Sequence, residues 1–199
     1  MKIFILSLGV VCFLFILLQS FTIMSTKKAE EQAYTIVKSF PDFEIRFYPS
    51  AFIATVNSNA KTYKELSGPG FQKLAGYIFG GNATAEKISM TSPVHMDIND
   101  SGSSMSFVMP SGYSENNLPA PNDSGVRIKK THEEYVAVIR FGGFASDNDL
   151  QFYAQKLQVL LYAQKISTHG HFRFLGYNPP FQVVNRRNEI VVAVNWKPD

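Results

Sequence analysis

The chain has 199 residues, of which 45% are hydrophobic and 18% charged, and its formal net charge is +3. This length fits one domain with a sizeable core, and the composition excludes intrinsic disorder over most of the chain. The weak and scattered positive charge excludes an extended nucleic-acid-binding surface. The single cysteine, Cys12, lies near the N-terminus, so the rest of the chain has no disulfide and no cysteine-ligated metal.

The chain begins with an apolar segment, Ile3 to Met24, that carries no charged side chain. As a helix, these 22 residues would rise about 33 Å, enough to cross a hydrocarbon core about 30 Å thick. A cleaved signal peptide has a shorter apolar region and ends in a small-residue cleavage site, which the sequence Ser-Phe-Thr at residues 20–22 does not provide. We therefore expect residues 1–24 to be an uncleaved signal anchor, a transmembrane helix, with a cleaved signal peptide as the alternative.

The charges that flank this segment decide its orientation only weakly. Lys2 lies at one end and Lys27 and Lys28 lie at the other, so the positive-inside rule is nearly balanced. By analogy with signal anchors, we expect a single-pass membrane protein whose folded domain lies on the extracytoplasmic side, and the opposite topology stays open. A charged linker, residues 25–33, leads to the folded domain, residues 34–197.

The first half of the domain alternates between strand and helix patterns. Period-two alternation and β-branched or aromatic side chains predict strands at residues 34–37, 43–48, 52–56, 87–98 and 105–109. A helix is predicted from Gly70 to Ile78, because four apolar residues recur there at helical spacing and glycines follow. These four are Phe71, Leu74, Ala75 and Ile78. A turn-rich stretch, residues 110–125, separates the two halves.

The second half of the domain repeats the same pattern. Strands are predicted at residues 126–131, 134–141, 172–177 and 189–196, with a helix at 147–166 capped by Ser146 or Asp147. Residues 52–56 resemble residues 135–139, and the strand from Phe107 resembles the strand from Ile190 at the same spacing. Two such units would pair around a pseudo-twofold axis. The sequence therefore predicts an α+β fold with duplicated β-α-β-β units, a bent sheet or open barrel flanked by two helices.

Residue patterns that would indicate catalysis or metal binding do not occur in the sequence. It contains no G-x-S-x-G nucleophile turn, no HExxH pattern and no phosphate-binding glycine loop. We therefore predict no catalytic residue and no protein metal site, and we expect a binding domain, not an enzyme. Breakdown of a tetrapyrrole or hydrolysis of a small ligand is the enzymatic alternative. The 17 Phe and 9 Tyr residues fit either an aromatic-lined pocket or ordinary strand packing.

An ordered set of sequence blocks provides a more specific indication. The blocks include FEIRFY at 43–48, MTSPV at 90–94, GYNPP at 176–180 and RRNEI at 186–190. In this order they resemble the SOUL haem-binding protein family, from about Tyr34 to Trp196. The resemblance implies a distorted, mostly antiparallel β-barrel of duplicated β-α-β-β units. It also implies that haem or a related tetrapyrrole binds in an apolar groove beside the first helix of the domain.

The resemblance implies which residues of this chain would contact the cofactor. The apolar face of that helix, Phe71, Leu74, Ala75 and Ile78, would line the groove, unless these side chains are ordinary core contacts. The position after the EIR triplet, where a histidine ligand has been proposed in the family, is Phe47 here. We therefore expect Phe47 to contact a haem that lacks an axial histidine at this position. The haem would then be held without a coordinating side chain or, alternatively, by Tyr48, Tyr63, Tyr77 or His95.

Two arginines that follow the GYNPP block are further candidates for cofactor binding. Arg186 and Arg187 would bind the haem propionates, because guanidinium groups bind carboxylates in bidentate fashion. The alternative is that Arg187 pairs with Glu189 or binds carbonyl groups of the turn.

Taken together, these observations predict a membrane-tethered protein that holds haem in an apolar groove for buffering or transfer, with no nucleic-acid partner. The alternative is a protein-interaction or small-molecule sensing module without physiological haem. The duplicated fold also resembles the effector-binding domains of bacterial multidrug regulators, in which a buried glutamate faces cationic ligands.

Overall fold

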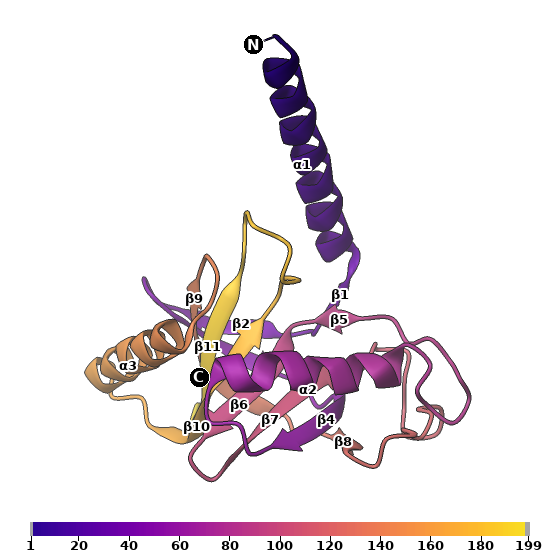
Figure 1. The fold of residues 1–199 in the computed structure, drawn as a ribbon. Coiled ribbons are helices and arrows are strands. Elements are labelled where there is room, and N and C mark those ends of the chain that lie inside the picture. Colours follow the sequence, from indigo (N-terminus) through magenta and orange to yellow (C-terminus); the bar gives the residue numbers. More distant parts are fainter. Residues whose placement is uncertain (1, 198–199) are drawn as a thin grey trace.

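The computed structural model describes the backbone of residues 2–197, and the side chains of these residues except 2–9, 12, 25, 27 and 28. Figure 1 shows three helices and a large sheet. The helices are α1 (Lys2–Lys28), α2 (Tyr63–Ile78) and α3 (Asp147–Ala163). The strands are β1 (Glu30–Glu31), β2 (Thr35–Ser39), β3 (Glu44–Tyr48), β4 (Phe52–Ser58), β5 (Thr91–Ser92), β6 (Val94–Asn99), β7 (Gly102–Val108), β8 (Val126–Lys130), β9 (Glu134–Phe141), β10 (Thr168–Gly176) and β11 (Asn188–Val194).

Nine strands form one antiparallel sheet in the order β2-β3-β9-β11-β10-β6-β7-β4-β8. Helix α2 packs on β4, β7 and β8, and α3 packs on β9, β10 and β11. The α+β class and the mostly antiparallel sheet are confirmed. The described sheet does not close into a barrel, because β2 and β8 lie at its opposite edges and do not pair with each other.

The strand order has the pseudo-twofold symmetry that the sequence repeat predicts. One unit runs β3-β4-α2-β6-β7 and the other runs β8-β9-α3-β10-β11. Exchanging the two units maps the eight-strand order onto itself, with the axis between β6 and β10. The first strand of each unit pairs with the other unit, β3 with β9 and β8 with β4. This exchange of strands joins the two halves into one domain.

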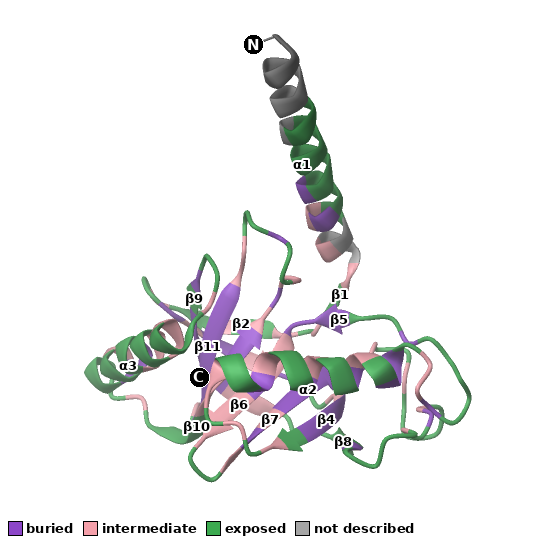
Figure 2. Cartoon of the chain, viewed as in Figure 1, coloured by how far each residue is buried: buried purple, intermediate pink, exposed green. Residues whose placement is uncertain are grey.

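Both faces of the central strands are buried, which explains their continuous apolar runs. In β9, Ala137 and Ile139 face the core beneath the helices, and Val136 and Val138 face a second, smaller cluster on the back of the sheet. Figure 2 shows the buried central strands between largely exposed helix surfaces and loops. The N-terminal segment contributes Tyr34 to the back-face cluster.

Helix α2 begins well before the predicted start at Gly70. Thr62 caps it by accepting a hydrogen bond from the Glu65 backbone, and Pro69 lies inside the helix. Proline and glycine disfavour a helix in isolation, so the sequence pattern did not predict the first half of α2. Tertiary packing compensates, because Leu66 is buried and a Cβ on Gly70 would lie 3.2 Å from the Met105 side chain of β7. The glycine therefore permits a close approach of helix and sheet.

Helix α3 agrees with its predicted start, because Ser146 is the N-cap and forms a capping box with Asp149. It ends at Ala163, slightly before the predicted end at Ile166. After α3 the chain changes direction at Lys165, whose backbone φ is +57°. The two helices cover different halves of the sheet (Figure 1).

The N-terminal segment forms helix α1, and the predicted linker is largely structured. Helix α1 extends to Lys28, and β1 then pairs in parallel with β5 through Glu30 and Glu31. Within the part of the chain that is described, no helix is both long enough and apolar enough to cross a membrane. The predicted anchor, residues 1–24, lies partly outside the residues whose side chains are described.

Candidate functional site

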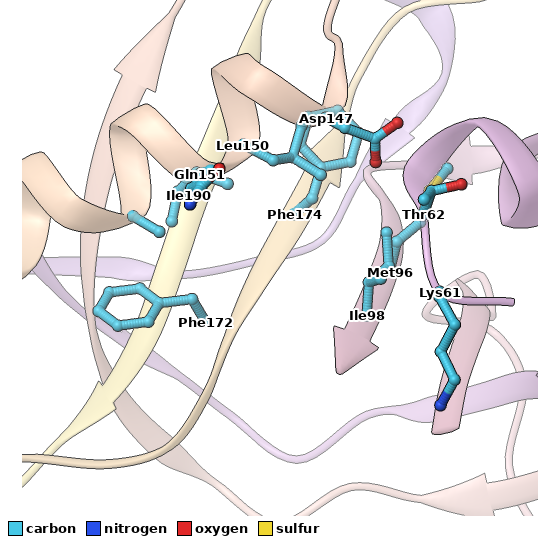
Figure 3. Close-up of a pocket in the computed structure, with 11 residues that line it drawn as sticks. Lys61, Thr62, Met96, Ile98, Asp147, Leu150, Gln151, Phe172, Phe174 and Ile190 are labelled. Atoms are coloured by element: carbon cyan, nitrogen blue, oxygen red, sulfur yellow. The ribbon is translucent and has the colours of Figure 1, made fainter. Parts of the chain in front are cut away.

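A pocket of about 320 Å³ lies at the centre of the helix-bearing face, between the N-terminal ends of α2 and α3 (Figure 3). Its position follows from the topology, because α2 and α3 each cover the strands of one half. The strands next to the pseudo-twofold axis, β6 and β10, contribute to its wall. The lining residues are Lys61, Thr62, Met96, Ile98, Asp147, Leu150, Gln151, Ala154, Phe172, Phe174 and Ile190.

The pocket combines an apolar wall with a polar rim. Two phenylalanines of β10, Phe172 and Phe174, line it together with Ile190 of β11 and Leu150 of α3 (Figure 3). Ligand pockets have volumes of about 300–1,000 Å³, so this one is at the small end. A ligand larger than the pocket would therefore remain partly exposed to solvent.

The rim groups are partly engaged by the protein itself. The Asp147 carboxylate accepts a hydrogen bond of 2.5 Å from the Tyr63 backbone N–H, and thereby links the two helix starts. The Lys61 ammonium donates to the carbonyl oxygen of Asp100. Lys61 is exposed, so its long side chain can exchange this contact for an anionic ligand group at little cost.

The four predicted groove residues lie on the core-facing side of α2. Leu74 and Ile78 are at most 1% exposed and belong to the core, so they offer no surface to a ligand. Phe71 and Ala75 are half-buried, and the Phe71 ring packs edge-on against Phe107 of β7 at 5.3 Å. None of the four is among the residues that line the pocket. These contacts agree with the alternative of ordinary core packing, and a ligand-binding role of the four residues stays a prediction.

Phe47 lies on β3, away from the pocket. Its ring packs against Tyr135 of β9 with the centroids 5.1 Å apart. Since β9 is the strand that pairs with β3, this is a cross-strand aromatic contact within the sheet.

The two candidate propionate ligands, Arg186 and Arg187, already bind protein groups. The Arg186 guanidinium donates to the carbonyl oxygens of Pro179 and Gln182, at 2.7 and 2.6 Å. Arg187 donates to Glu189 at 2.9 Å and to Glu31 at 2.7 Å. The structure therefore shows the alternative pairing of Arg187 with Glu189, and the turn carbonyls are bound by Arg186.

A buried polar network occupies the back of the sheet, opposite the pocket. The Glu189 carboxylate is fully buried and accepts two hydrogen bonds from Arg46, at 2.9 and 3.2 Å. It also accepts one from the Tyr177 hydroxyl at 2.7 Å. Burial, and the negative charge of Glu189, raise the pKa of Tyr177, which therefore stays a hydrogen-bond donor at neutral pH. Glu189 and the pocket-lining Ile190 are adjacent on β11, so they face opposite sides of the sheet.

His95 also faces the back of the sheet. Its Nε2 atom lies 2.7 Å from the Gln32 side-chain oxygen, and burial together with the charge of Arg173 lowers its pKa to about 3. The neighbouring Met96 points into the pocket, because side chains alternate along a strand. Among the described residues, no group of three His, Cys, Asp or Glu side chains converges on a possible metal site.

Sequence reasoning missed the residues that line the pocket. Met96 and Ile98 were inside a predicted strand, and Phe172 and Phe174 were inside another, both with apolar side chains at every second position. That alternation identifies an apolar face on each strand. The duplicated pattern is the additional signal that these two faces lie side by side, because the last strand pairs of the two symmetric units meet at the axis.

Solved structures share this fold at low sequence identity. The C-terminal domain of EcmrR matches with a TM-score of 0.54 and 10% identity, covering 82% of this chain and 99% of that chain. A hydrolase from Listeria innocua matches with a TM-score of 0.53 and 8% identity, covering 86% and 96%. At such identities the likeness concerns the fold alone.

Similarity in sequence is greater to two vertebrate proteins. Heme-binding protein 2 from Mus musculus is 31% identical over 165 residues, which are 78% of this chain and 80% of that protein. Heme-binding protein 1 from Xenopus laevis is 29% identical over 156 residues, which are 74% and 81%. The family model described as SOUL heme-binding protein matches residues 29–193. The match confirms the resemblance carried by the sequence blocks: the chain belongs to the SOUL heme-binding protein family.

Proposed function

We propose that this chain binds haem or a closely related tetrapyrrole in the pocket between α2 and α3, and that it acts as a binding protein without catalysing a reaction. The observation that carries the proposal is the apolar pocket at the pseudo-twofold axis, open at one side and lined by side chains from both units. The relatives named heme-binding proteins support the choice of ligand class.

The pocket residues fit the chemistry of haem. A tetrapyrrole is a flat apolar ring, for which Phe172, Phe174 and Leu150 offer matching surfaces. Its propionate carboxylates would lie at the rim, where Lys61 supplies a positive charge. The described lining residues include no histidine and no tyrosine, which favours retention by packing over axial coordination. When bound, haem supplies an iron centre, and the protein's contribution is to shield one part of the ring from water.

A buried-glutamate site for cationic ligands is not formed around Glu189. Its carboxylate is engaged by Arg46, Arg187 and Tyr177, and it faces the side of the sheet opposite the pocket. A cationic ligand would have to displace the buried guanidinium group of Arg46 and the half-buried one of Arg187, which is costly. This pairing favours tetrapyrrole binding over the cation-sensing alternative.

Hemin titration of the full chain tests the proposal. We expect a saturable shift of the Soret band. Ala154→Phe places a ring in the pocket and should weaken uptake by at least tenfold. Val159→Phe is the matched control, because Val159 lies on the same helix, is 68% exposed and is not a lining residue. No saturable shift, or equal affinity loss in both variants, would overturn the proposal.

The second part of the proposed function is a membrane tether that keeps the bound haem at a membrane for buffering or transfer. Support comes from the apolar segment Ile3 to Met24 and from the exposure of described α1 side chains such as Phe13, Leu14 and Phe21, which are 58–71% exposed. Exposed apolar surface of this extent needs a nonpolar partner. The domain would then lie on the extracytoplasmic side.

Flotation of the full chain with phospholipid vesicles tests the tether, and protease accessibility in native membranes tests the side. We expect co-flotation that resists alkaline extraction, and digestion only from the extracytoplasmic side. A chain that stays with the aqueous phase would refute the tether and leave the haem proposal standing.

A further inference from the structure

The loop between β10 and β11 displays apolar side chains outward, next to α1. Phe181, Val183 and Val184 are 58%, 45% and 45% exposed, and Phe144 of the β9–α3 connection is 56% exposed. A loop that faces water normally presents polar side chains. Figure 1 shows both connections reaching toward the side from which α1 leaves the domain.

Two polar side chains of this loop, Gln182 and Arg186, are turned inward and bind loop carbonyl groups. Gln182 is 2% exposed, and its amide nitrogen donates to the Val184 carbonyl at 3.0 Å. The Arg186 guanidinium binds the loop carbonyls and lies over the Phe144 ring, with the guanidinium carbon 4.5 Å from the ring centroid. Apart from the exposed Asn185, the loop therefore has polar side chains on its inside and apolar side chains on its outside, an arrangement that suits contact with the interfacial layer of a bilayer.

The same loop satisfies the polar side chains of α1. The Gln19 amide donates to the Phe181 carbonyl at 3.1 Å and accepts from the Val183 backbone N–H at 2.8 Å. The Thr26 hydroxyl donates to the Gln182 side-chain oxygen at 2.8 Å. Gln19 is 6% exposed, whereas Phe21 is 71% exposed. The loop therefore covers the polar side of α1 and leaves its apolar side free.

These contacts set the depth of the loop relative to the apolar segment. Gln19 precedes Met24, the end of that segment, by five residues, or about 7 Å along the helix axis. Interfacial apolar groups in membrane proteins are buried about 5–10 Å into the boundary between headgroups and acyl chains. The loop backbone at Phe181 lies beside Gln19 and therefore matches this depth.

We propose that the loop of residues 178–186 is a second membrane contact, which inserts Phe181, Val183 and Val184 into the interfacial layer of the bilayer beside α1. The proposal rests on the proposed tether. The paired contacts of α1 and the loop would hold the domain in one orientation on the membrane, because two contacts restrict tilting where a single helix does not.

A fluorescent label on the loop tests this contact in the full chain. The native Cys12 is changed to serine, and an environment-sensitive dye is attached at Val183→Cys or, in a second variant, at Val184→Cys. The control is Glu115→Cys, an exposed position in the β7–β8 connection. Each protein is reconstituted into phosphatidylcholine vesicles with and without a lipid that carries a nitroxide high on its acyl chain.

We expect blue-shifted emission and nitroxide quenching at residues 183 and 184, and neither effect at residue 115. If the chain floats with the vesicles but all three labels behave alike, the loop contact is overturned and the tether stands. If the chain does not float, both are overturned. Hemin titration of the same samples reports separately on the pocket.

Discussion

Glu189 is the buried carboxylate around which the back of the sheet is organised. It binds Arg46 of β3, Tyr177 at the end of β10, and Arg187. Arg187 in turn binds Glu31 and the Tyr34 hydroxyl of the N-terminal segment. Glu189 therefore connects the central strands to the segment that carries α1.

Removing the charge of Glu189 should be strongly destabilising. Glu189→Gln removes the fully buried carboxylate that Arg46 and Arg187 share and leaves them only Glu44 and Glu31 as countercharges, at a cost of up to about 3–5 kcal/mol in the free energy of unfolding. Urea denaturation measures this. The control is Asp42→Asn, since Asp42 pairs with Lys156 at 3.3 Å on the exposed surface and such pairs contribute at most about 1 kcal/mol. Similar losses in the two variants would contradict the assigned role of Glu189.

His95 should make the stability of the domain depend on pH. Its pKa is about 3 in the folded chain and 6.5 when unperturbed, so the unfolded state binds more protons between these values. The free energy of unfolding should therefore fall as the pH is lowered from 6.5 toward 3. His95→Gln keeps a hydrogen-bond partner for Gln32 and should flatten this part of the profile. An unchanged profile in His95→Gln would refute the assignment.

At the level of elements, α2 shows how packing overrides local preference. Its first half contains Gly68 and Pro69, which disfavour a helix, and the sequence pattern predicts a helix only from Gly70 onward. The helix forms there because Leu66 and Gly70 lie against the sheet, where burial offsets the weak propensity. The position of this helix also determines where the pocket opens, since Lys61 and Thr62 immediately precede it.

The close approach of α2 and β7 predicts a position-specific effect in this helix. Gly70→Leu should destabilise the domain by about 1–3 kcal/mol, because the new side chain would press on Met105. Gly76→Leu should instead add about 0.5–1 kcal/mol, since a Cβ at this position would have no neighbouring atom within 4 Å and leucine favours a helix. Thermal unfolding of both variants decides this. A stabilising Gly70→Leu change would show that α2 does not pack closely here.

At the level of the whole molecule, the exchange of first strands makes the two units one cooperative sheet. β11 is buried along its whole length near the centre, whereas β2 and β8 are mostly exposed edge strands. Local opening costs least where few apolar contacts are broken. The molecule should therefore open from its two edges inward.

Hydrogen exchange measured by mass spectrometry tests this order of opening. Peptides that cover β9 and β11 should exchange last, and peptides that cover β2 and β8 should exchange first. If one half of the domain instead exchanged as a block before the other half, the units would be independent and the strand exchange would not couple them.

The sequence by itself determined the family, the fold class, the two repeated units and most strand positions. These follow from ordered motifs and from the period of apolar side chains, which are local properties. The start of α2 was missed, because Pro69 and its neighbouring glycines carry the opposite local signal. The apolar face at Phe71 and Leu74 was visible in the sequence, but periodicity does not distinguish a sheet from a ligand as the packing partner.

Only the tertiary structure decided where that face packs, whether the sheet closes, and which arginines are paired. The pocket takes Met96 from one unit and Phe174 from the other, and no local pattern shows that these strands are neighbours. Arg187 likewise binds two carboxylates, that of Glu189, which is close in the sequence, and that of Glu31, which lies near the N-terminus. Such contacts depend on strand order, which is set by the burial of the whole sheet.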